Sequence, residues 1–193
     1  MKPRAPTGNE RPPTRPAGRR GTTLKSRLRR VRLFLCDVDG ILTDAGVYMG
    51  PETETKRFNI RDGFGLRLMQ RQGIKVGWIS NRPSIATTRR AKDLKVDFLH
   101  QAEGSKVAAI EAILTVTGFG WEQVCFMGDD IVDLGALRRA GLAVTVSNGV
   151  AEARSLSHYV TGCAAGDGAV REVAEMILKA QDKWAPLVTE YSV

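Results

Sequence analysis

Short apolar runs alternate with longer amphipathic stretches along this chain from residue 31 onward. Six apolar runs have the length and composition of buried strands: 31–36, 74–79, 96–99, 124–127, 142–146 and 159–160. The stretches around them have helical spacing: 62–72, 83–94, 105–116, 134–140, 151–155 and 169–184. Strands that alternate with helices in this way form βαβ units. The pattern therefore predicts an α/β fold, a doubly wound parallel sheet covered by helices on both faces.

Several residues mark the ends of the predicted helices, and one segment interrupts the alternation. Asp62 and Ser105 stand where N-caps are expected, and Gly73 and Gly141 directly follow helical stretches. Residues 47–49 and 55–60 have strand character and flank the turn 50–54. They predict a β-hairpin over about 45–61, inserted between the first strand and its helix.

The charge of the chain is distributed unevenly. Its 193 residues suffice for one domain with its own core. Residues 1–32 carry 11 of the 29 basic residues and one acid, whereas the rest carries 18 basic residues against 20 acids. The basic segment is rich in Pro, Arg and Gly and has no apolar periodicity. The sequence thus predicts a disordered basic tail (1–26), a folded body (27–184) and a C-terminal tail (185–193).

Composition also restricts location and partners. The basic tail lacks the apolar core of a secretory signal, and no later segment is long enough to cross a membrane. Three widely spaced cysteines, Cys36, Cys125 and Cys163, are typical of buried thiols in a reducing cytoplasm. We interpret the tail as a solvated extension, with a transit peptide or a nucleic-acid-binding arm as alternatives, and expect no nucleic-acid partner for the nearly neutral body.

Polar residues gather where the predicted strands end. Because the carboxyl ends of parallel strands meet at one edge of a sheet, we expect these residues to converge there. Carboxylates and a lysine in one place suit phosphoryl transfer, in which a carboxylate attacks, hard oxygens bind Mg²⁺ and a cation stabilises the phosphoryl charge. The clusters are Asp37 and Asp39, then Ser80-Asn81-Arg82, then Lys106, then Asp129, Asp130 and Asp133.

The order of these clusters resembles the four motifs of the haloacid dehalogenase superfamily, over about residues 31–183. The matching residues are Asp37-Val38-Asp39-Gly40, Ser80, Lys106 and Gly128-Asp129-Asp130. The resemblance implies a Rossmann-like core and a phosphatase that forms an aspartyl-phosphate. Asp37 would be the nucleophile, Asp39 the general acid and base, and Lys106 a charge on the phosphoryl oxygens.

The same resemblance implies a set of ligands and supporting residues. Asp37, the main-chain carbonyl of Asp39 and Asp129 would bind Mg²⁺. Residues expected to bind the substrate and its phosphoryl group are Ser80, Asn81, Arg82 and Gly40. Asp130 and Asp133 would orient metal-bound waters and Lys106, with Thr43 as a further supporting residue. Asp133 has the alternative role of an exposed cap at a helix start.

The spacing of the motifs leaves no room for a cap domain. Only 41 residues separate Asp39 from Ser80, and 26 separate Ser80 from Lys106. The missing cap, the hairpin and the sequence segments 61–63 and 168–173 together resemble the capless 3-deoxy-D-manno-octulosonate 8-phosphate phosphatases. The resemblance implies a phosphorylated sugar acid as substrate, lipopolysaccharide biosynthesis, and a homotetramer whose neighbouring subunits close the site. In that family the C-terminal tail can reach the active site of a neighbouring subunit, and the resemblance implies the same for residues 185–193 here.

Two positions depart from that family's pattern. Ser80-Asn81 replaces a common Thr-Gly, which preserves the hydroxyl group, and Asp167 replaces a frequent basic residue. An acid there disfavours an anionic sugar unless it faces away. Arg82 and Arg171 are candidates for the substrate carboxylate, and Arg171 equally for a structural ion pair. Alternative functions are a sialic-acid-type 9-phosphate phosphatase and a phospho-accepting regulatory domain.

Overall fold

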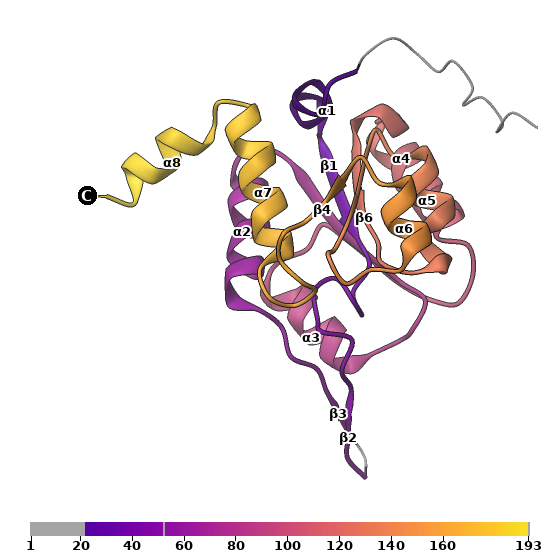
Figure 1. The fold of residues 1–193 in the computed structure, drawn as a ribbon. Helices are drawn as coiled ribbons and strands as arrows, with labels where there is room; N and C mark the ends of the chain where they lie inside the picture. The colour runs from indigo at the N-terminus through magenta and orange to yellow at the C-terminus, as the bar shows by residue number, and fades with distance from the viewer. Residues whose placement is uncertain (1–21, 52, 193) are drawn as a thin grey trace, which may run out of the picture.

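The central sheet of the computed structural model, which describes residues 22–51 and 53–192, has helices on both faces (Figure 1). Six strands lie in the order β5-β4-β1-β6-β7-β8, and each pairs with its neighbours in parallel. This confirms the predicted fold class. The strands are β1 (Leu33–Cys36), β4 (Lys75–Ser80), β5 (Phe98–Gln101), β6 (Val124–Met127), β7 (Leu142–Thr145) and β8 (Tyr159–Val160).

Two separate layers of helices bury the faces of the sheet. One layer consists of α1 (Leu24–Arg30), α2 (Ile60–Arg71), α3 (Ile85–Asp93) and α7 (Ala169–Ala180), and the other of α4 (Lys106–Thr117), α5 (Leu134–Arg139) and α6 (Ala151–Leu156). Successive residues of β1 face opposite layers, so Phe34 and Cys36 pack in the first and Leu33 and Leu35 in the second. Short 3₁₀ turns precede β6 (Trp121–Gln123) and α5 (Ile131–Asp133).

The predicted hairpin projects beyond the carboxyl end of β1, at the bottom of Figure 1. Its strands, β2 (Tyr48–Met49) and β3 (Glu54–Thr55), are antiparallel and shorter than expected. Below them an isolated bridge joins Thr43 to Phe58, whose ring stacks on Trp78 at a centroid distance of 6.2 Å. These contacts attach the base of the hairpin to the core, while its tip extends into solvent.

Both ends of the chain differ from the prediction. Leu24–Ser26 lie in α1 rather than in the basic tail, because Thr23 caps this helix and Leu28 is buried against the core; residues 1–21 of the predicted tail lie outside the described residues. At the other end, α7 stops at Ala180 and a separate helix, α8 (Trp184–Glu190), occupies most of the predicted tail.

The break between α7 and α8 has the geometry of a Schellman motif. Asp182 has a φ of +59°, the Asp182 N–H donates to the Lys179 carbonyl and the Lys183 N–H to the Leu178 carbonyl. The following helix is held on α2, since Arg71 contacts Glu190 at 2.6 Å and the Tyr191 hydroxyl at 2.7 Å. Helix α8 therefore lies far from the hairpin of the same chain (Figure 1).

Asp62 does not cap its own helix as the sequence suggested. Asn59 fills that role, since its side chain accepts from the N–H of Arg61 at 2.8 Å. Asp62 is buried one turn further on, and its carboxylate accepts the Arg171 N–H of α7 at 2.7 Å. A carboxylate at the first turn of a neighbouring helix satisfies amides that lack intrahelical partners.

Two further predictions concern the membrane and the cysteines. Over the residues that the structure describes, every helix is too short or too polar to cross a lipid bilayer. Cys36, Cys125 and Cys163 are all free thiols, and the first two are buried in the sheet as expected.

Candidate active site

The loop that follows β1 forms the centre of the site. The Asp37 N–H donates to the Met127 carbonyl at 2.9 Å, so the pairing of β1 with β6 continues to Asp37. The chain then turns back sharply, because the Val38 carbonyl accepts from the N–H groups of Leu42 at 3.0 Å and Thr43 at 3.2 Å. The buried Thr43 hydroxyl also lies 3.4 Å from the Val38 carbonyl. This local network fixes the Asp37 carboxylate at the carboxyl edge of the sheet.

Lys106 and Asp133 come from other strand ends and meet Asp37. The Lys106 ammonium, at the start of α4, lies 2.8 Å from Asp37 Oδ2 and 2.6 Å from Asp133 Oδ1. Asp133 Oδ2 accepts the N–H groups of Asp129 at 3.0 Å and Asp130 at 3.3 Å. Asp133 is fully buried, so the alternative of an exposed cap is wrong. Its position does fit the expected role of orienting Lys106.

The oxygens of Asp37 and Asp129 are arranged to accept a cation. Together with Asp133, these two residues offer oxygens that all lie within 4.8 Å of one another. Both oxygens of Asp133 are already engaged, whereas Asp129 Oδ1 is buried with no hydrogen-bond partner among the described residues. Three carboxylates against one lysine leave an excess of negative charge, and a divalent ion with oxygen preference such as Mg²⁺ fits this set.

Gly40 makes room for the Asp129 carboxylate. Its φ of +90° disfavours other residues, and a Cβ at this position would lie 2.1 Å from Asp129 Oδ2. Gly40 was expected to bind substrate phosphate, and the structure instead shows it in close contact with a candidate metal ligand. Asp130 is exposed and its Oδ1 accepts the N–H of Ile131 at 2.6 Å, so it caps the 3₁₀ turn. Its expected role toward metal-bound waters stays a prediction.

Burial changes the proton affinity of these groups. It raises the pKa of Asp37 to about 6, with Lys106 opposing the rise and Asp133 adding to it. Burial, with repulsion from Asp133 and Asp37, raises the pKa of Asp129 to about 7. For Lys106 burial alone would lower the pKa, but Asp37 and Asp133 outweigh it and the pKa is raised. A positive ion between the carboxylates would therefore compete with protons.

The residues after β4 border the same site. The buried Ser80 hydroxyl accepts the N–H of Arg82 at 3.1 Å, and Asn81 Nδ2 donates to the Gly104 carbonyl at 3.1 Å. Arg82 reaches across to the hairpin, where Nη1 lies 2.6 Å from Glu54 Oε2, and its Nε lies 3.4 Å from Asp39 Oδ2. The Arg82 side chain is therefore placed beside Asp39, while Ser80 organises the turn.

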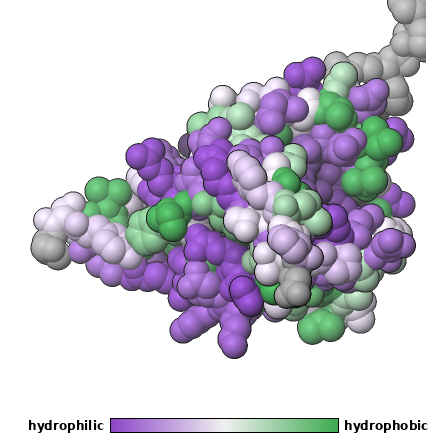
Figure 2. All heavy atoms as spheres, turned by 90° about the horizontal axis from the view of Figure 1, so that it is seen from below, coloured by the Kyte–Doolittle hydropathy of each residue, from purple (hydrophilic) through white to green (hydrophobic). Residues whose placement is uncertain are grey.

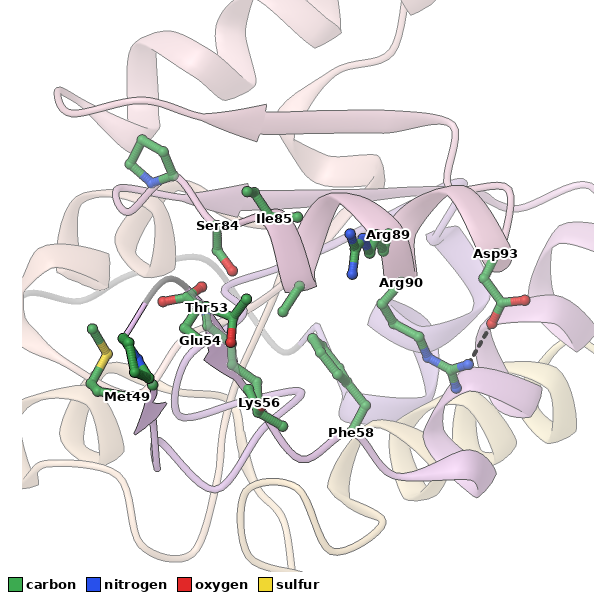
Figure 3. A pocket seen from close by; sticks show the side chains of 15 residues that line it. Met49, Thr53, Glu54, Lys56, Phe58, Ser84, Ile85, Arg89, Arg90 and Asp93 are labelled. Atoms are coloured by element: carbon green, nitrogen blue, oxygen red, sulfur yellow. Dashed lines mark hydrogen bonds and ion pairs between the residues drawn. The ribbon is translucent and has the colours of Figure 1, made fainter.

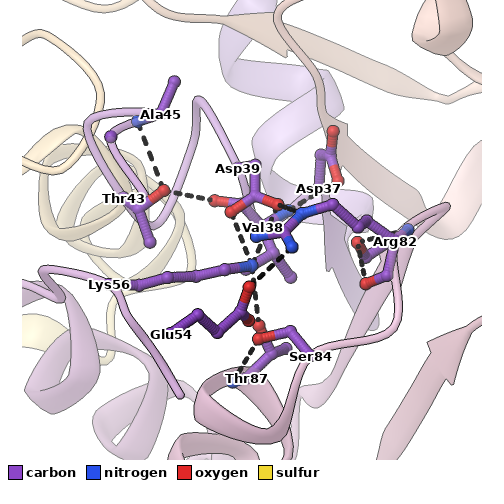
Figure 4. A network of polar contacts seen from close by, with 12 residues as sticks. Asp37, Val38, Asp39, Thr43, Ala45, Glu54, Lys56, Arg82, Ser84 and Thr87 are labelled. Atoms are coloured by element: carbon purple, nitrogen blue, oxygen red, sulfur yellow. Dashed lines mark hydrogen bonds and ion pairs between the residues drawn. The ribbon is translucent and has the colours of Figure 1, made fainter. Parts of the chain in front are cut away.

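Two hairpin residues that sequence reasoning missed complete the surroundings of Asp39. Lys56 Nζ lies 2.7 Å from Asp39 Oδ1 and 3.2 Å from Thr87 Oγ1 (Figure 4). Glu54, two residues earlier, binds Arg82. The available signal was the expected hairpin itself, because an insertion directly after the first strand lies beside the carboxyl edge of the sheet, where the charged residues 54 and 56 can reach the site.

A groove of about 840 Å³ separates the hairpin from α3 (Figure 3). Lys56 and Glu54 contribute to its wall and also to the contacts around Asp39. The nucleophile candidate Asp37 does not line it, so the groove adjoins the site behind Lys56. Other lining residues include Met49, Phe58, Ile85 and Arg90.

The two residues that raised questions about an anionic substrate both have partners. Asp167 lies 2.8 Å from Arg57 Nη2, and the same guanidinium binds Asp44 at 2.9 Å, so the charge of Asp167 is compensated. Arg171 pairs with Glu175 at 2.8 Å, and its guanidinium lies over the rings of Phe64 and Trp184. Arg171 thus has a structural role in joining α2, α7 and α8.

Comparison with known families agrees with this site. Residues 79–173 match the model of the haloacid dehalogenase-like hydrolases. The matched segment contains the strand-end clusters from Ser80 to Asp133, and the Asp37 loop that precedes it lies in contact with them. Fold and site together define a haloacid dehalogenase-like hydrolase, as the sequence motifs indicated.

Individual relatives specify the family further. The chain is 39% identical over 158 residues to 3-deoxy-D-manno-octulosonate 8-phosphate phosphatase KdsC of Yersinia pestis, covering 81% of this chain and 84% of that protein. It is 37% identical, with a TM-score of 0.84, to the Moraxella catarrhalis phosphatase crystallised with a magnesium ion, a phosphate ion and a KDO molecule, covering 86% of this chain and 97% of the other. The chain belongs to the 3-deoxy-D-manno-octulosonate 8-phosphate phosphatase family and is a phosphoric monoester hydrolase.

Proposed function

We propose that this chain hydrolyses 3-deoxy-D-manno-octulosonate 8-phosphate to 3-deoxy-D-manno-octulosonate and phosphate, through an aspartyl-phosphate and with Mg²⁺. The observation that carries the proposal is the Asp37 carboxylate at the end of β1, bound by the buried Lys106 and beside Asp129. The relatives support the proposed substrate, and the strand-end geometry supports the proposed chemistry. The catalytic body, expected over residues 27–184, would also include the start of α1 and helix α8, which pack on the same core.

Asp37 is the proposed nucleophile. With a pKa of about 6 it is mainly ionised at neutral pH, and its fixed position at the strand end would present an oxygen to an incoming phosphorus. Lys106, held by Asp133, places a positive charge where negative charge spreads over the phosphoryl oxygens. Asp133 thereby keeps the lysine in place without touching the substrate.

Asp37, the main-chain carbonyl of Asp39 and Asp129 are the proposed ligands of Mg²⁺. When bound, the ion neutralises the repulsion between a phosphate dianion and the carboxylates. Asp39 would protonate the leaving oxygen and later accept a proton from the attacking water. Ser80, Asn81 and Arg82 would contact the phosphoryl group or the sugar from the other side of the site.

Exposed apolar side chains around the site are the surface that neighbouring subunits would cover in a homotetramer, which is part of this proposal. On the hairpin Tyr48 is 65% and Met49 is 76% exposed, and Ile85 and Ile131 at neighbouring loop ends are similarly exposed. Viewed from below, apolar surface is scattered among polar surface on this side of the molecule (Figure 2). Neighbouring subunits that cover these residues would exclude water from the site, over which residues 22–51 and 53–192 form no cap domain.

A substrate panel tests the proposed reaction. Purified chain with Mg²⁺ would be given phosphorylated eight- and nine-carbon sugar acids, and released phosphate would be measured. We expect the highest kcat/KM for the 8-phosphate and no measurable turnover for Asp37→Asn. Asp44→Asn is a matched control, because Asp44 lies on the same loop but pairs with Arg57.

Other results would contradict the proposal in identifiable ways. A preference for a sialic-acid-type 9-phosphate would replace the substrate. A long-lived phosphoprotein without turnover would indicate the regulatory-domain alternative, which the comparisons do not favour. Wild-type activity in Asp37→Asn would refute the proposed nucleophile.

A further inference from the structure

Lys56 is a buried lysine whose ammonium group meets the carboxylate of Asp39. Nζ lies 2.7 Å from Oδ1 and 2.9 Å from Oδ2 of Asp39, and the Lys56 side chain is 0% exposed. The third contact, to Thr87 Oγ1 of α3, places Nζ between the loop after β1 and that helix (Figure 4). Because a buried ammonium group loses its hydration, it is retained only where such partners compensate.

A second cation reaches Asp39 and is also attached to the hairpin. Arg82 Nε lies 3.4 Å from Asp39 Oδ2, and the same guanidinium binds Glu54 of β3 at 2.6 Å. A hydrogen bond from Ser84 and the contact with Arg82 lower the pKa of Glu54, which therefore stays anionic. Both cations that hold the Asp39 carboxylate thus depend on the hairpin: Lys56 directly follows its strand β3, and Arg82 is bound by Glu54 of that strand.

We infer that Lys56 is a positioning residue for Asp39, through which the hairpin sets the orientation of the acid–base group. The inference rests on the proposed function. In the first step an Asp37 oxygen bonds to phosphorus, the bond from phosphorus to the leaving oxygen breaks, and that oxygen receives a proton through the side chain of Asp39. In the second step water bonds to phosphorus, the bond to Asp37 breaks, and the Asp39 carboxylate takes a proton from the water.

Lys56 touches none of the reacting atoms. Its effect on the rate therefore depends on how much a given substrate requires proton transfer through Asp39. A leaving group that departs readily as an anion needs no proton, whereas a poor one does. Loss of Lys56 should therefore slow the cleavage of poor leaving groups selectively. A general loss of structure would slow all substrates alike.

The experiment compares kcat/KM for p-nitrophenyl phosphate and phenyl phosphate, which lack the sugar acid and differ in the acidity of the leaving phenol. For Lys56→Met we expect a fall of about 100-fold on phenyl phosphate, the size of effect expected when an acid–base group is misplaced, and less than about threefold on p-nitrophenyl phosphate. Lys56→Arg, which keeps a cation, should recover part of the loss. Arg57→Met removes a neighbouring cation that does not bind Asp39 and should leave both values unchanged.

Equal losses on both substrates, or no loss on either, would overturn the inference. Circular dichroism establishes that each variant is folded. If Lys56→Met does not fold, Thr87→Val removes one partner of the lysine and should give a smaller loss with the same selectivity; an unselective effect of that variant counts against Lys56. A wild-type chain that cleaves aryl phosphates but not the sugar phosphate contradicts only the proposed substrate, whereas inactivity on both contradicts the reaction and the inference together.

Discussion

Replacing Asp133 by Asn tests whether this buried carboxylate organises the site. The two side chains have nearly the same shape, so the change removes charge and one acceptor but creates no cavity. Asp133 accepts from Lys106 at 2.6 Å through one oxygen and from two backbone N–H groups through the other. In one orientation of the Asn amide its NH₂ group faces the Lys106 ammonium group, and in the other it faces the two backbone N–H groups. At least one buried donor thus loses its acceptor.

The expected cost can be worked from these contacts. Breaking a buried ion pair costs about 3–5 kcal/mol, and a hydrogen bond to a charged group contributes about 1.5–3 kcal/mol. Two effects reduce this loss. Lys106 retains Asp37 as a partner at 2.8 Å, and removal of the Asp133 charge ends its repulsion of the Asp37 and Asp129 carboxylates. We expect a decrease of about 2–3 kcal/mol in the free energy of unfolding, which is roughly 4–12 °C in Tm for a chain of this size.

Thermal unfolding followed by circular dichroism measures this decrease, with Asp130→Asn as the matched control. Asp130 is adjacent in the chain and also acidic, but it is exposed and caps only a 3₁₀ turn, so its replacement should change stability by less than about 0.5 kcal/mol. In the activity assay Asp133→Asn should lower kcat, because Lys106 loses the group that orients it. A Tm equal to that of wild type would refute the assigned role of Asp133.

Three further changes test the metal ligands and the C-terminal helix. Gly40→Ala should weaken Mg²⁺ binding by about tenfold or more, as measured by calorimetry, because the added methyl group displaces the Asp129 carboxylate. Gly73→Ala is the control: this glycine has a φ of +81° and nothing within 4 Å of an added Cβ, so the change adds backbone strain alone and should leave Mg²⁺ binding unchanged. Because the raised pKa of Asp129, about 7, means that a proton occupies this ligand below that pH, Mg²⁺ affinity should fall by up to about tenfold per unit as the pH drops from about 7 to about 6. An affinity that does not change over this range would contradict the shift. Leu187 of α8 is 2% exposed, so Leu187→Ala should lower the free energy of unfolding by about 2–4 kcal/mol. Val188→Ala, on the exposed face of the same helix, should lower it little. Equal Tm values for the two variants would show that α8 does not pack on the core.

The sequence by itself determined the layers of the fold and the edge on which the chemistry lies. Apolar runs of strand length fixed which segments enter the sheet, and the parallel arrangement that follows brings their carboxyl ends together. Asp37, Lys106 and Asp129 could therefore be placed near one another without knowledge of any contact, because their common location depends only on element order. The hairpin was likewise evident from its turn and its flanking alternation.

Only the tertiary structure decided which polar groups pair. From the sequence Asp133 could be either an exposed cap or a residue that orients Lys106, and the fold decides for a fully buried partner of Lys106. Asp62 caps a helix more than a hundred residues away. Lys56 resembled an ordinary hairpin residue until folding brought it to Asp39. The pattern of apolar positions within a segment predicts the secondary structure of that segment and which of its residues are buried. The partner of a buried charge depends on how separate segments pack, because its lost hydration must be replaced by whichever groups the fold brings beside it.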